Sequence, residues 1–512
     1  MVGVSKPYPL KLNYYLTLTA ILFSFGKNKM SSWRIVMSFV DEFKKASSLK
    51  TTENGGVAYS KLDNDLLSFF AIVGAMRNRS EKDIIDMYMA ARNEDKELAD
   101  KIVLYARDIR GGGLGERRVG RILLKELAKL DPKKVIRNFE TFVEVGRFDD
   151  LYSLVDTPCE NEMWKFMYKT LVADLVKVTR GEPISLAAKW MKSINTSSAE
   201  SRKLAKKFCQ VNNESERAYR KSLAILRKYS NVVETKMSGN KWNSINYETV
   251  PSLAMKKYTN CFSKRDEERF NKYMKDVRNG KAKINAATLF PYDLVEKYLY
   301  NSPENDIIEA QWKALPNYFK EGRNVICCAD VSGSMGGMPM AASIGLALYC
   351  AQHNSGPYKN LMLTFTDIPQ FFEIKDSDSL YDNVRRIRNH IGYNTNMDGM
   401  FKAIYEVAKK ANESPESLVI VSDMEIDRFM RAGACDSIID KWVKKFNEIG
   451  LDCPKLILWN AAARNNTYLT SGHPYVSFVS GVSAGTFANL STLIDKSAYD
   501  AMIDILNQYE YK

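Results

Sequence analysis

An apolar run that ends in a cluster of oxygen-bearing side chains constrains the fold of this chain most. Residues 325–329 read Val-Ile-Cys-Cys-Ala, and Asp330, Ser332 and Ser334 follow at alternate positions. Alternate residues of an extended segment point to the same side, so one carboxylate and two hydroxyls converge at the end of a buried strand. Such oxygens suit Mg²⁺ (or Mn²⁺), which binds through one or two carboxylates and waters. The segment predicts a strand that ends in a divalent cation site.

Two later segments place further oxygen atoms where such a site needs them. Thr395 lies in a polar loop after a helix-like stretch, and residues 418–421 form a second apolar run that leads into Ser422 and Asp423. Ligands of open α/β sheets collect beyond the carboxyl ends of the strands, so we expect Thr395 and Asp423 to meet Asp330 there. A serine-containing turn that holds no metal is the alternative interpretation.

Strand-like and helix-like stretches alternate through the C-terminal part of the chain. This alternation, with short loops, predicts a mostly parallel sheet covered by helices on both faces, and hence an α/β, Rossmann-like domain over residues 321–512. The expected strands are residues 324–329, 361–366, 370–374, 418–422, 455–460 and 476–479, and the expected helices are residues 338–353, 379–390, 397–411, 435–449 and 484–506.

The preceding region reads as mostly helical. Its apolar side chains recur at spacings of three and four, as in Ile122, Leu123 and Leu127. Successive helix pairs without a strict sequence repeat indicate a degenerate α-solenoid. We assign this all-α module to residues 37–320.

The first 36 residues share little with this pattern and are expected to be a dispensable extension. Their uncharged stretch, residues 12–26, is short for a membrane span, which needs about 20 apolar residues, and no signal-peptide cleavage pattern follows it. Translation from Met30 or Met37 is another interpretation. We expect a cytoplasmic protein without membrane attachment, since the eight cysteines show neither a disulfide framework nor zinc-site spacing.

The positive charge is concentrated in the helical region. The chain has a formal net charge of +13, whereas residues 101–300 alone carry a surplus of 16 Lys and Arg over Asp and Glu. A basic region beside a mildly acidic domain favours a polyanion as the partner of the former. The first candidate contacts are Lys203, Lys206, Lys207, Arg217, Arg220, Lys221 and Lys228. Residues 215–229 form an expected helix with basic side chains opposite its apolar ones, and an ordinary solvated face is the simpler explanation for this helix alone.

A glycine-rich segment, residues 107–118, is the second candidate for phosphate contact. It reads Arg-Asp-Ile-Arg-Gly-Gly-Gly-Leu-Gly-Glu-Arg-Arg and so surrounds its glycines with arginines. Glycine lets backbone N–H groups approach an anion, and arginine binds phosphate in a bidentate manner, so Arg110, Arg117 and Arg118 are candidate RNA contacts. A tight turn between two helices, with its arginines paired to nearby acids, is the equally weighted alternative.

The order of these and other segments resembles a family that joins a TROVE-like (Ro autoantigen-like) helical module to a von Willebrand factor A domain. The matching segments are residues 107–118, 145–151, 186–190, 219–221, 232–237, 250–255, 330–334, 422–425 and 458–460. The resemblance implies a ring of HEAT-like helices that binds single-stranded or structured RNA, with the ends of structured or misfolded RNA in its hole and small noncoding RNA on its basic outer surface. It also implies a metal-ion-dependent adhesion site (MIDAS) formed by Asp330, Ser332, Ser334, Thr395 and Asp423.

Three classes of function remain open. The first is RNA binding by the basic module within a ribonucleoprotein. The second is a protein-interaction scaffold, in which an acidic residue of a partner completes the metal site. The third, hydrolysis, is not expected, because residues 332–336 do not match the G-x-S-x-G nucleophile elbow and no carboxylate cluster for two metals is present in the sequence. We therefore expect a binding protein rather than an enzyme.

Overall fold

The computed structural model describes residues 49–51, 57–230, 232–319, 323–366, 368–390, 392, 395–425, 434–470 and 472–512. The predicted N-terminal extension, residues 1–36, lies outside this part of the chain. Residues Met1–Lys50 and Thr51–Lys512 form two separate units, and the second contains the helical region and the α/β domain. None of its described helices has the length and apolarity needed to cross a membrane.

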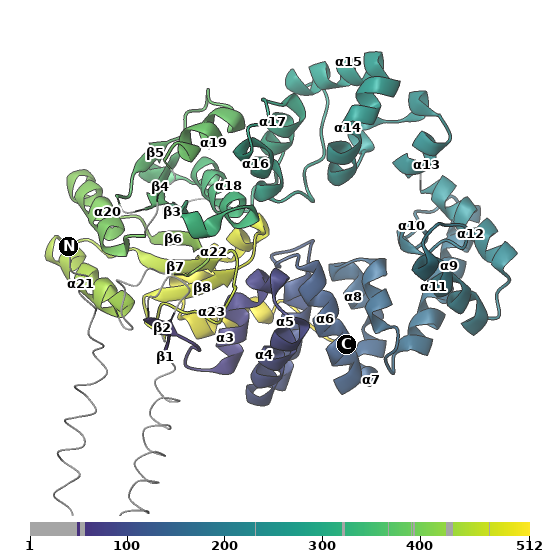
Figure 1. Cartoon of the computed structure of the whole chain (residues 1–512), viewed down its shortest axis with the longest axis horizontal. Coiled ribbons are helices and arrows are strands. Elements are labelled where there is room, and N and C mark those ends of the chain that lie inside the picture. Colours follow the sequence, from purple (N-terminus) through teal and green to yellow (C-terminus); the bar gives the residue numbers. More distant parts are fainter. Residues whose placement is uncertain are drawn as a thin grey trace, which may run out of the picture. The chain divides into compact units, whose positions relative to one another are not determined.

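Short helices follow one another from Asp65 to Lys313 (Figure 1). Polar caps explain where several begin, since Ser80, Asp95 and Ser215 each accept a hydrogen bond from the backbone N–H three residues on. The helices are α3 (Asp65–Ile72), α4 (Glu81–Glu94), α5 (Lys96–Arg107), α6 (Arg117–Leu130), α7 (Pro132–Arg137), α8 (Phe139–Val145), α9 (Glu160–Thr179), α10 (Ala187–Trp190), α11 (Ala199–Val211), α12 (Glu216–Tyr229), α13 (Val233–Ser238), α14 (Ser252–Arg265), α15 (Glu267–Arg278), α16 (Pro291–Leu299) and α17 (Asp306–Lys313), with the 3₁₀ turns η1 (Val73–Asn78) and η2 (Phe148–Leu154). The predicted helical region is confirmed.

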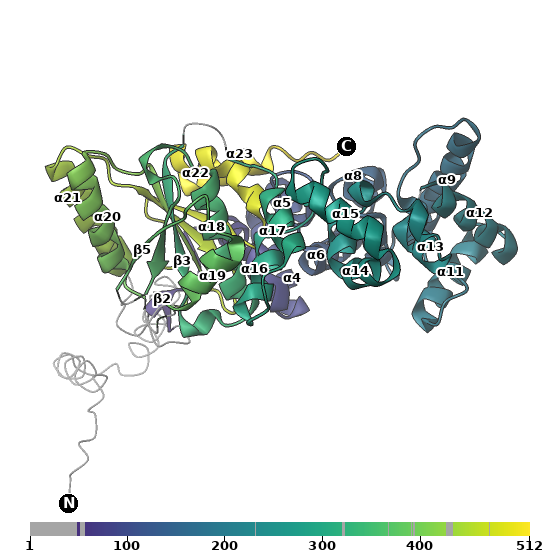
Figure 2. The ribbon, with the colours of Figure 1, turned by 90° about the horizontal axis from the view of Figure 1, so that it is seen from above.

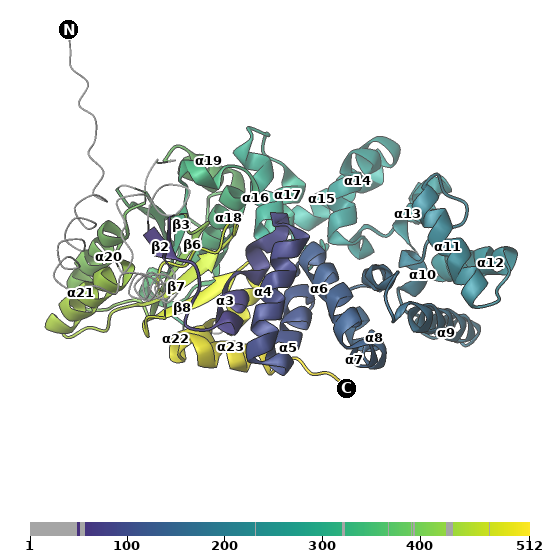
Figure 3. The same ribbon diagram turned by 60° about the horizontal axis from the view of Figure 1, so that its bottom comes forward.

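The helices pack mainly against their neighbours in the chain. Figure 3 shows α4, α5 and α6 side by side, and α9 packs against α11 and α12. The buried apolar side chains form two clusters. The smaller cluster belongs to α13, α14, α15 and the turns between them, with Ile307 of α17, and is built around Tyr247, Phe262, Phe270 and Tyr273. Helix α16 and Trp312 of α17 belong to the larger cluster, which continues into the sheet.

A six-stranded sheet follows the helices, in the order β5-β4-β3-β6-β7-β8. Its strands are β3 (Val325–Asp330), β4 (Leu361–Phe365), β5 (Phe371–Glu373), β6 (Ser417–Ser422), β7 (Lys455–Asn460) and β8 (Val476–Ser480). All neighbours are parallel except β4 and β5. Fully buried strands such as β3 and β6 carry continuous apolar runs because both their faces are covered. The predicted α/β domain with a mostly parallel sheet is confirmed.

Helices cover both faces of the sheet (Figure 2). They are α18 (Met338–His353), α19 (Leu380–Arg388), α20 (Met397–Ala411), α21 (Ala434–Glu448), α22 (Leu490–Asp495) and α23 (Ala498–Leu506). Helix α18 packs on β3, β4 and β6, whereas α20 and α21 pack together on the opposite face. The turn after β3 lies at the edge of the sheet where the parallel strands end.

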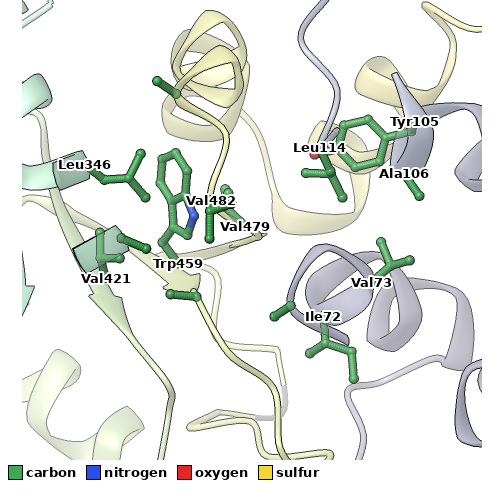
Figure 4. Packing of buried hydrophobic residues seen from close by; sticks show 14 of the residues in the cluster. Ile72, Val73, Tyr105, Ala106, Leu114, Leu346, Val421, Trp459, Val479 and Val482 are labelled. Atoms are coloured by element: carbon green, nitrogen blue, oxygen red, sulfur yellow. The ribbon is translucent and has the colours of Figure 1, made fainter. Parts of the chain in front are cut away.

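The helical region contacts the α/β domain at both of its ends. At the first end α3 packs on β8, and Figure 4 shows the apolar side chains of the sheet, including Trp459, continuing toward Ile72 and Tyr105. Gly74 allows this approach, because a Cβ there would lie 2.7 Å from the carbonyl oxygen of Ser480. At the other end α16 packs on α18, and the indole N–H of Trp312 donates to the Gln352 side chain over 2.7 Å.

Candidate functional site

Asp330 ends β3 at the carboxyl edge of the sheet, and both of its carboxylate oxygens accept hydrogen bonds. The backbone N–H of Ser332 donates to Oδ1 over 2.9 Å, and the hydroxyl of Ser422 donates to Oδ2 over 2.5 Å. Ser422 ends the neighbouring strand β6. The carboxylate is buried and fixed between two strand ends, as the sequence pattern requires.

The two serine hydroxyls of the Asp-x-Ser-x-Ser segment lie together. The Oγ atoms of Ser332 and Ser334 are 3.2 Å apart; Ser332 immediately precedes the 3₁₀ turn η5 (Gly333–Met335), and Ser334 lies within it. Ser332 is buried, and Ser334 is partly exposed. The structure thus brings one carboxylate and two hydroxyls to one tight turn.

Asp423 is the second carboxylate at this edge, one residue after β6. The backbone N–H of Glu425 donates to its Oδ1 over 3.1 Å, while its buried Oδ2 has no hydrogen-bond partner among the described residues. Burial, and next the charge of Asp330, raise the pKa of Asp423 to about 6. Met424, the residue after it, has a φ of 61°, a left-handed conformation that non-glycine residues rarely adopt. The backbone is strained at the candidate site.

Arg464 is a site residue that the sequence analysis missed. It follows β7, and its guanidinium lies 3.8 Å from Asp423 Oδ2 and donates a hydrogen bond to the backbone carbonyl of Ser334. Its side chain is 40% exposed, whereas that of Asp423 is fully buried. The rule that ligands gather at the ends of parallel strands would have pointed to the loop after β7, but not to this residue.

Thr395 stands two residues before α20, half-buried. Its loop reaches the same edge of the sheet, because a Cβ on Gly392 would lie 2.8 Å from the Thr366 methyl group, just after β4. Thr395 stays a predicted ligand.

The residues present fit a hard divalent cation. The unsatisfied Oδ2 of Asp423 and the paired hydroxyls of Ser332 and Ser334 are oxygen donors of the kind that Mg²⁺ or Mn²⁺ binds. Two nearby carboxylates repel each other, and a cation between them would relieve that repulsion. Groups of three or more His, Cys, Asp or Glu side chains that would mark another metal site do not occur in the described residues.

The structure places the predicted basic contacts on two successive helices, α11 and α12. Most of them are exposed: Lys203, Lys206, Arg217, Arg220, Lys221 and Lys228. Within the described part of the chain, none of these six forms an ion pair. Lys207 differs, because it is partly buried and pairs with Glu160. The apolar side chains of α12, among them Tyr219 and Leu223, face the core.

The glycine-rich segment forms a tight turn between α5 and α6. Asp108 accepts hydrogen bonds from the backbone N–H groups of Arg110 and Gly111, and the Tyr509 hydroxyl donates to it over 2.8 Å. Gly113 allows the turn, since a Cβ there would lie 2.5 Å from the Asp108 side chain. The turn therefore docks on the C-terminal segment of the chain.

The arginines of this turn are engaged to different degrees. Arg107 is buried and pairs with Asp150, and Arg117 pairs with Asp149, each over 2.7 Å. Arg118 donates to the backbone carbonyls of Arg77, within η1, and of Arg79, just after it. Arg110 is exposed and makes no side-chain hydrogen bond or ion pair with the described residues. Its role, like those of Arg117 and Arg118, stays a prediction.

Comparison with protein families divides the chain close to the boundary between helices and sheet. Residues 192–322 match a family model described as a domain of unknown function, DUF2828, and residues 324–501 match another, DUF7788. The boundary between the two matches falls where α17 and its following loop give way to β3.

Two known proteins are similar to the chain over most of its length. "Uncharacterized protein L728" of Acanthamoeba polyphaga mimivirus is 28% identical over 509 residues, covering 90% of this chain and 88% of the viral protein. A crystal structure of the Deinococcus radiodurans RO (RSR) protein aligns with 87% of this chain and 100% of that chain, at 13% identity and a TM-score of 0.36. The sequence similarity to the viral protein therefore extends over both the helical region and the α/β domain of this chain.

Proposed function

We propose that this protein binds RNA through the exposed basic surface of α11 and α12, and that its α/β domain binds a divalent cation. The observation that carries the RNA proposal is the group of six exposed Lys and Arg side chains without ion pairs, among the described residues, on these two helices. The proposal contains no catalytic step.

Unpaired basic side chains in water favour a polyanion for a physical reason. Each Lys or Arg that neutralises a phosphate releases a condensed counterion, so phosphate contacts supply affinity without sequence preference. A structural role would instead leave these side chains in ion pairs, as it leaves Arg107 with Asp150. The surplus of 16 positive charges in residues 101–300 is thus available, in part, to an external anion.

Charge reversal tests the RNA proposal. Replacing Lys203, Lys206, Arg217 and Arg220 by Glu should weaken binding of a single-stranded RNA by about 4 kcal/mol, on the order of 1 kcal/mol for each lost contact. The dependence of log K on log salt should flatten by about 3 for four contacts to a single strand. Filter binding over a range of salt concentrations measures both.

The matched control replaces four exposed lysines of the α/β domain by Glu: Lys402, Lys409, Lys410 and Lys444. It changes the net charge of the chain by the same amount as the first variant does. Its RNA affinity should stay close to that of the unchanged protein. Equal losses in the two variants, or no RNA binding by the unchanged protein at low salt, would contradict the proposal.

For the metal, the proposed ligands are Asp330, Ser332, Ser334, Thr395 and Asp423, as in a MIDAS of a von Willebrand factor A domain. A bound Mg²⁺ would supply an open coordination position for an oxygen ligand. The chain's own contribution is to hold Asp330 between two strands and to keep Asp423 Oδ2 free of hydrogen bonds from the described residues.

Calorimetric titration with Mn²⁺ tests this site. Asp330→Ala should abolish binding, and Ser334→Ala, which removes only a partly exposed hydroxyl, should weaken it about tenfold, as expected for one lost ligand. Asp440→Ala, at an exposed residue of α21, is the control. Unchanged binding in both site variants would refute the assignment.

A protein-interaction scaffold is the second candidate, and Arg464 favours it. Its partly exposed guanidinium beside Asp423 would give a partner's carboxylate a second contact next to the metal. In that case an Asp-containing peptide should bind only when Mg²⁺ is present, and Arg464→Ala should weaken it without affecting RNA.

A further inference from the structure

Three arginines converge on a single carboxylate oxygen in the helical region. The Nη2 atoms of Arg117, Arg121 and Arg147 lie 2.7, 2.8 and 2.8 Å from Asp149 Oδ2. A carboxylate oxygen has about two lone-pair positions, so it cannot satisfy three guanidinium groups at once. In keeping with this, Nη2 of Arg121 is buried and has no hydrogen bond of good geometry among the described residues.

A second carboxylate does not remove the excess of positive charge. Asp150 accepts from Nε of Arg107 and from Nε of Arg121, each over 2.7 Å. These side chains form what we call the arginine cluster: Arg107, Arg117, Arg121, Arg147, Asp149 and Asp150. Its four guanidinium groups share two carboxylates, which leaves two positive charges uncompensated within the cluster.

The surplus charge has an electrostatic consequence. Burial, and then the charges of Arg121 and Arg147, lower the pKa of Arg117 despite its ion pair with Asp149. The Arg117 side chain is also 52% exposed, whereas those of Arg121 and Arg147 are 28% and 21% exposed. The cluster is therefore open to solvent on the side of Arg117.

Its surroundings add further positive charge and hold one arginine in place. The guanidinium of Arg147 lies 3.9 Å from the centre of the Trp190 ring, and the ammonium of Lys189 lies 5.3 Å from the same ring. Lys192 lies over Tyr152 of η2, at 4.9 Å. Stacking on Trp190 fixes the plane of Arg147. Asp149 accepts from its Nε and Nη2 over 2.9 and 2.8 Å, so Nη1 is the nitrogen of this guanidinium that makes no hydrogen bond with the described residues.

We propose that the arginine cluster is a binding site for a phosphate group, which Arg117 contacts from the exposed side together with Arg147. Guanidinium forks match the spacing of two phosphate oxygens, and a dianion would neutralise the two surplus charges. The phosphate belongs either to a free anion or to the backbone of RNA. Only the RNA source rests on the proposed function.

Thermal unfolding and calorimetry of the full chain with inorganic phosphate test the site, with chloride at equal ionic strength as the reference. Phosphate should raise the unfolding temperature more than chloride does. Arg117→Gln should weaken phosphate binding roughly tenfold, as expected for one lost charge-assisted contact. Arg385→Gln, at an exposed position of α19 in the α/β domain, is the matched control and should leave it unchanged.

Asp149→Asn separates a binding role from a purely structural one. It removes the carboxylate that competes with the ligand, so phosphate should bind more tightly although the fold becomes less stable. If this variant does not fold, Arg117→Lys, which keeps the charge but not the fork, should bind phosphate with intermediate affinity. Equal responses to phosphate and chloride, or unchanged phosphate binding by Arg117→Gln, would overturn the proposal.

RNA titrations identify the source of the phosphate. Competition between phosphate and single-stranded RNA, with both weakened by Arg117→Gln, supports the site and assigns it to the RNA backbone. Loss of phosphate binding with unchanged RNA affinity supports the site and assigns it to a free phosphate. A chain that binds phosphate but no RNA at all would refute the proposed function and leave the site intact.

Discussion

The turn between α5 and α6 and the surface of α11 and α12 are both rich in basic residues, yet the structure uses them differently. Around the turn, Arg107 is buried with Asp150 and Arg118 holds backbone carbonyls. On α11 and α12, residues such as Arg220 and Lys221 are exposed and form no ion pair in the part of the chain that the structure describes. The first group is largely committed to the fold, and the second is available to a partner.

The difference lies in the acids that tertiary structure brings near. Asp149 and Asp150 belong to η2, about 30 to 40 residues from their arginine partners on α5 and α6. Over the described ranges of the chain, no comparable pair of acids binds the basic side chains of α12. A basic segment therefore predicts an anion site where its positive charges outnumber the acids that folding brings near.

Replacement of Arg107 should change the free energy of unfolding more than the other substitutions considered below. Its guanidinium makes two contacts of 2.7 Å with Asp150 and is almost fully buried. Arg107→Ala should lower the free energy of unfolding by about 3 kcal/mol, because a buried carboxylate loses a partner. Urea unfolding measures this, and Arg220→Ala should change stability by less than about 0.5 kcal/mol. Similar losses of stability in both variants would contradict the distinction between the paired and the exposed basic residues.

Low pH should reduce the stability that comes from the ion pairs around Asp149 and should have little effect on the exposed basic surface of α11 and α12. Burial acts to raise the pKa of the Asp149 carboxyl. The hydrogen bond and charge of Arg147, together with the charges of Arg121 and Arg117, outweigh it and lower this pKa to about 2. Because the folded-state pKa is below the unfolded one, the stabilisation is complete above about pH 4 and is lost as the pH falls through 2. It amounts to about 2 kcal/mol. Urea unfolding between pH 5 and pH 2.5 should show this slope, and Asp149→Asn should flatten it, whereas an equally steep slope in that variant would contradict the assignment.

The docking of the glycine turn on the C-terminal segment should contribute least. The hydroxyl of Tyr509 donates to Asp108, which also orders the turn through Arg110 and Gly111. Tyr509→Phe keeps the ring and removes this bond, so it should cost about 1.5 kcal/mol, since the acceptor is charged. Hydrogen exchange should show faster exchange at Gly111. Unchanged exchange there would mean that Tyr509 does not hold the turn.

Several features could be predicted from the sequence because their cause is local. Apolar runs with strand length preceded Asp330 and Ser422, and both residues end parallel strands at one edge of the sheet. The three- and four-residue spacing of apolar side chains placed helices such as α6 and α12. Arg464 had no such signal, because its place beside Asp423 depends on the path of the loop after β7.

The sequence by itself determined the order of helices and strands, the position of the Asp-x-Ser-x-Ser turn at a strand end, and the concentration of positive charge before the sheet. These follow from side-chain periodicity and composition, which act over a few residues. Only the tertiary structure decided which charges are neutralised, that Gly74 and Tyr509 join the helical region to the α/β domain, and that Asp423 Oδ2 is buried without a hydrogen bond among the described residues. Those outcomes depend on contacts between residues far apart in the chain, whose geometry no local pattern specifies.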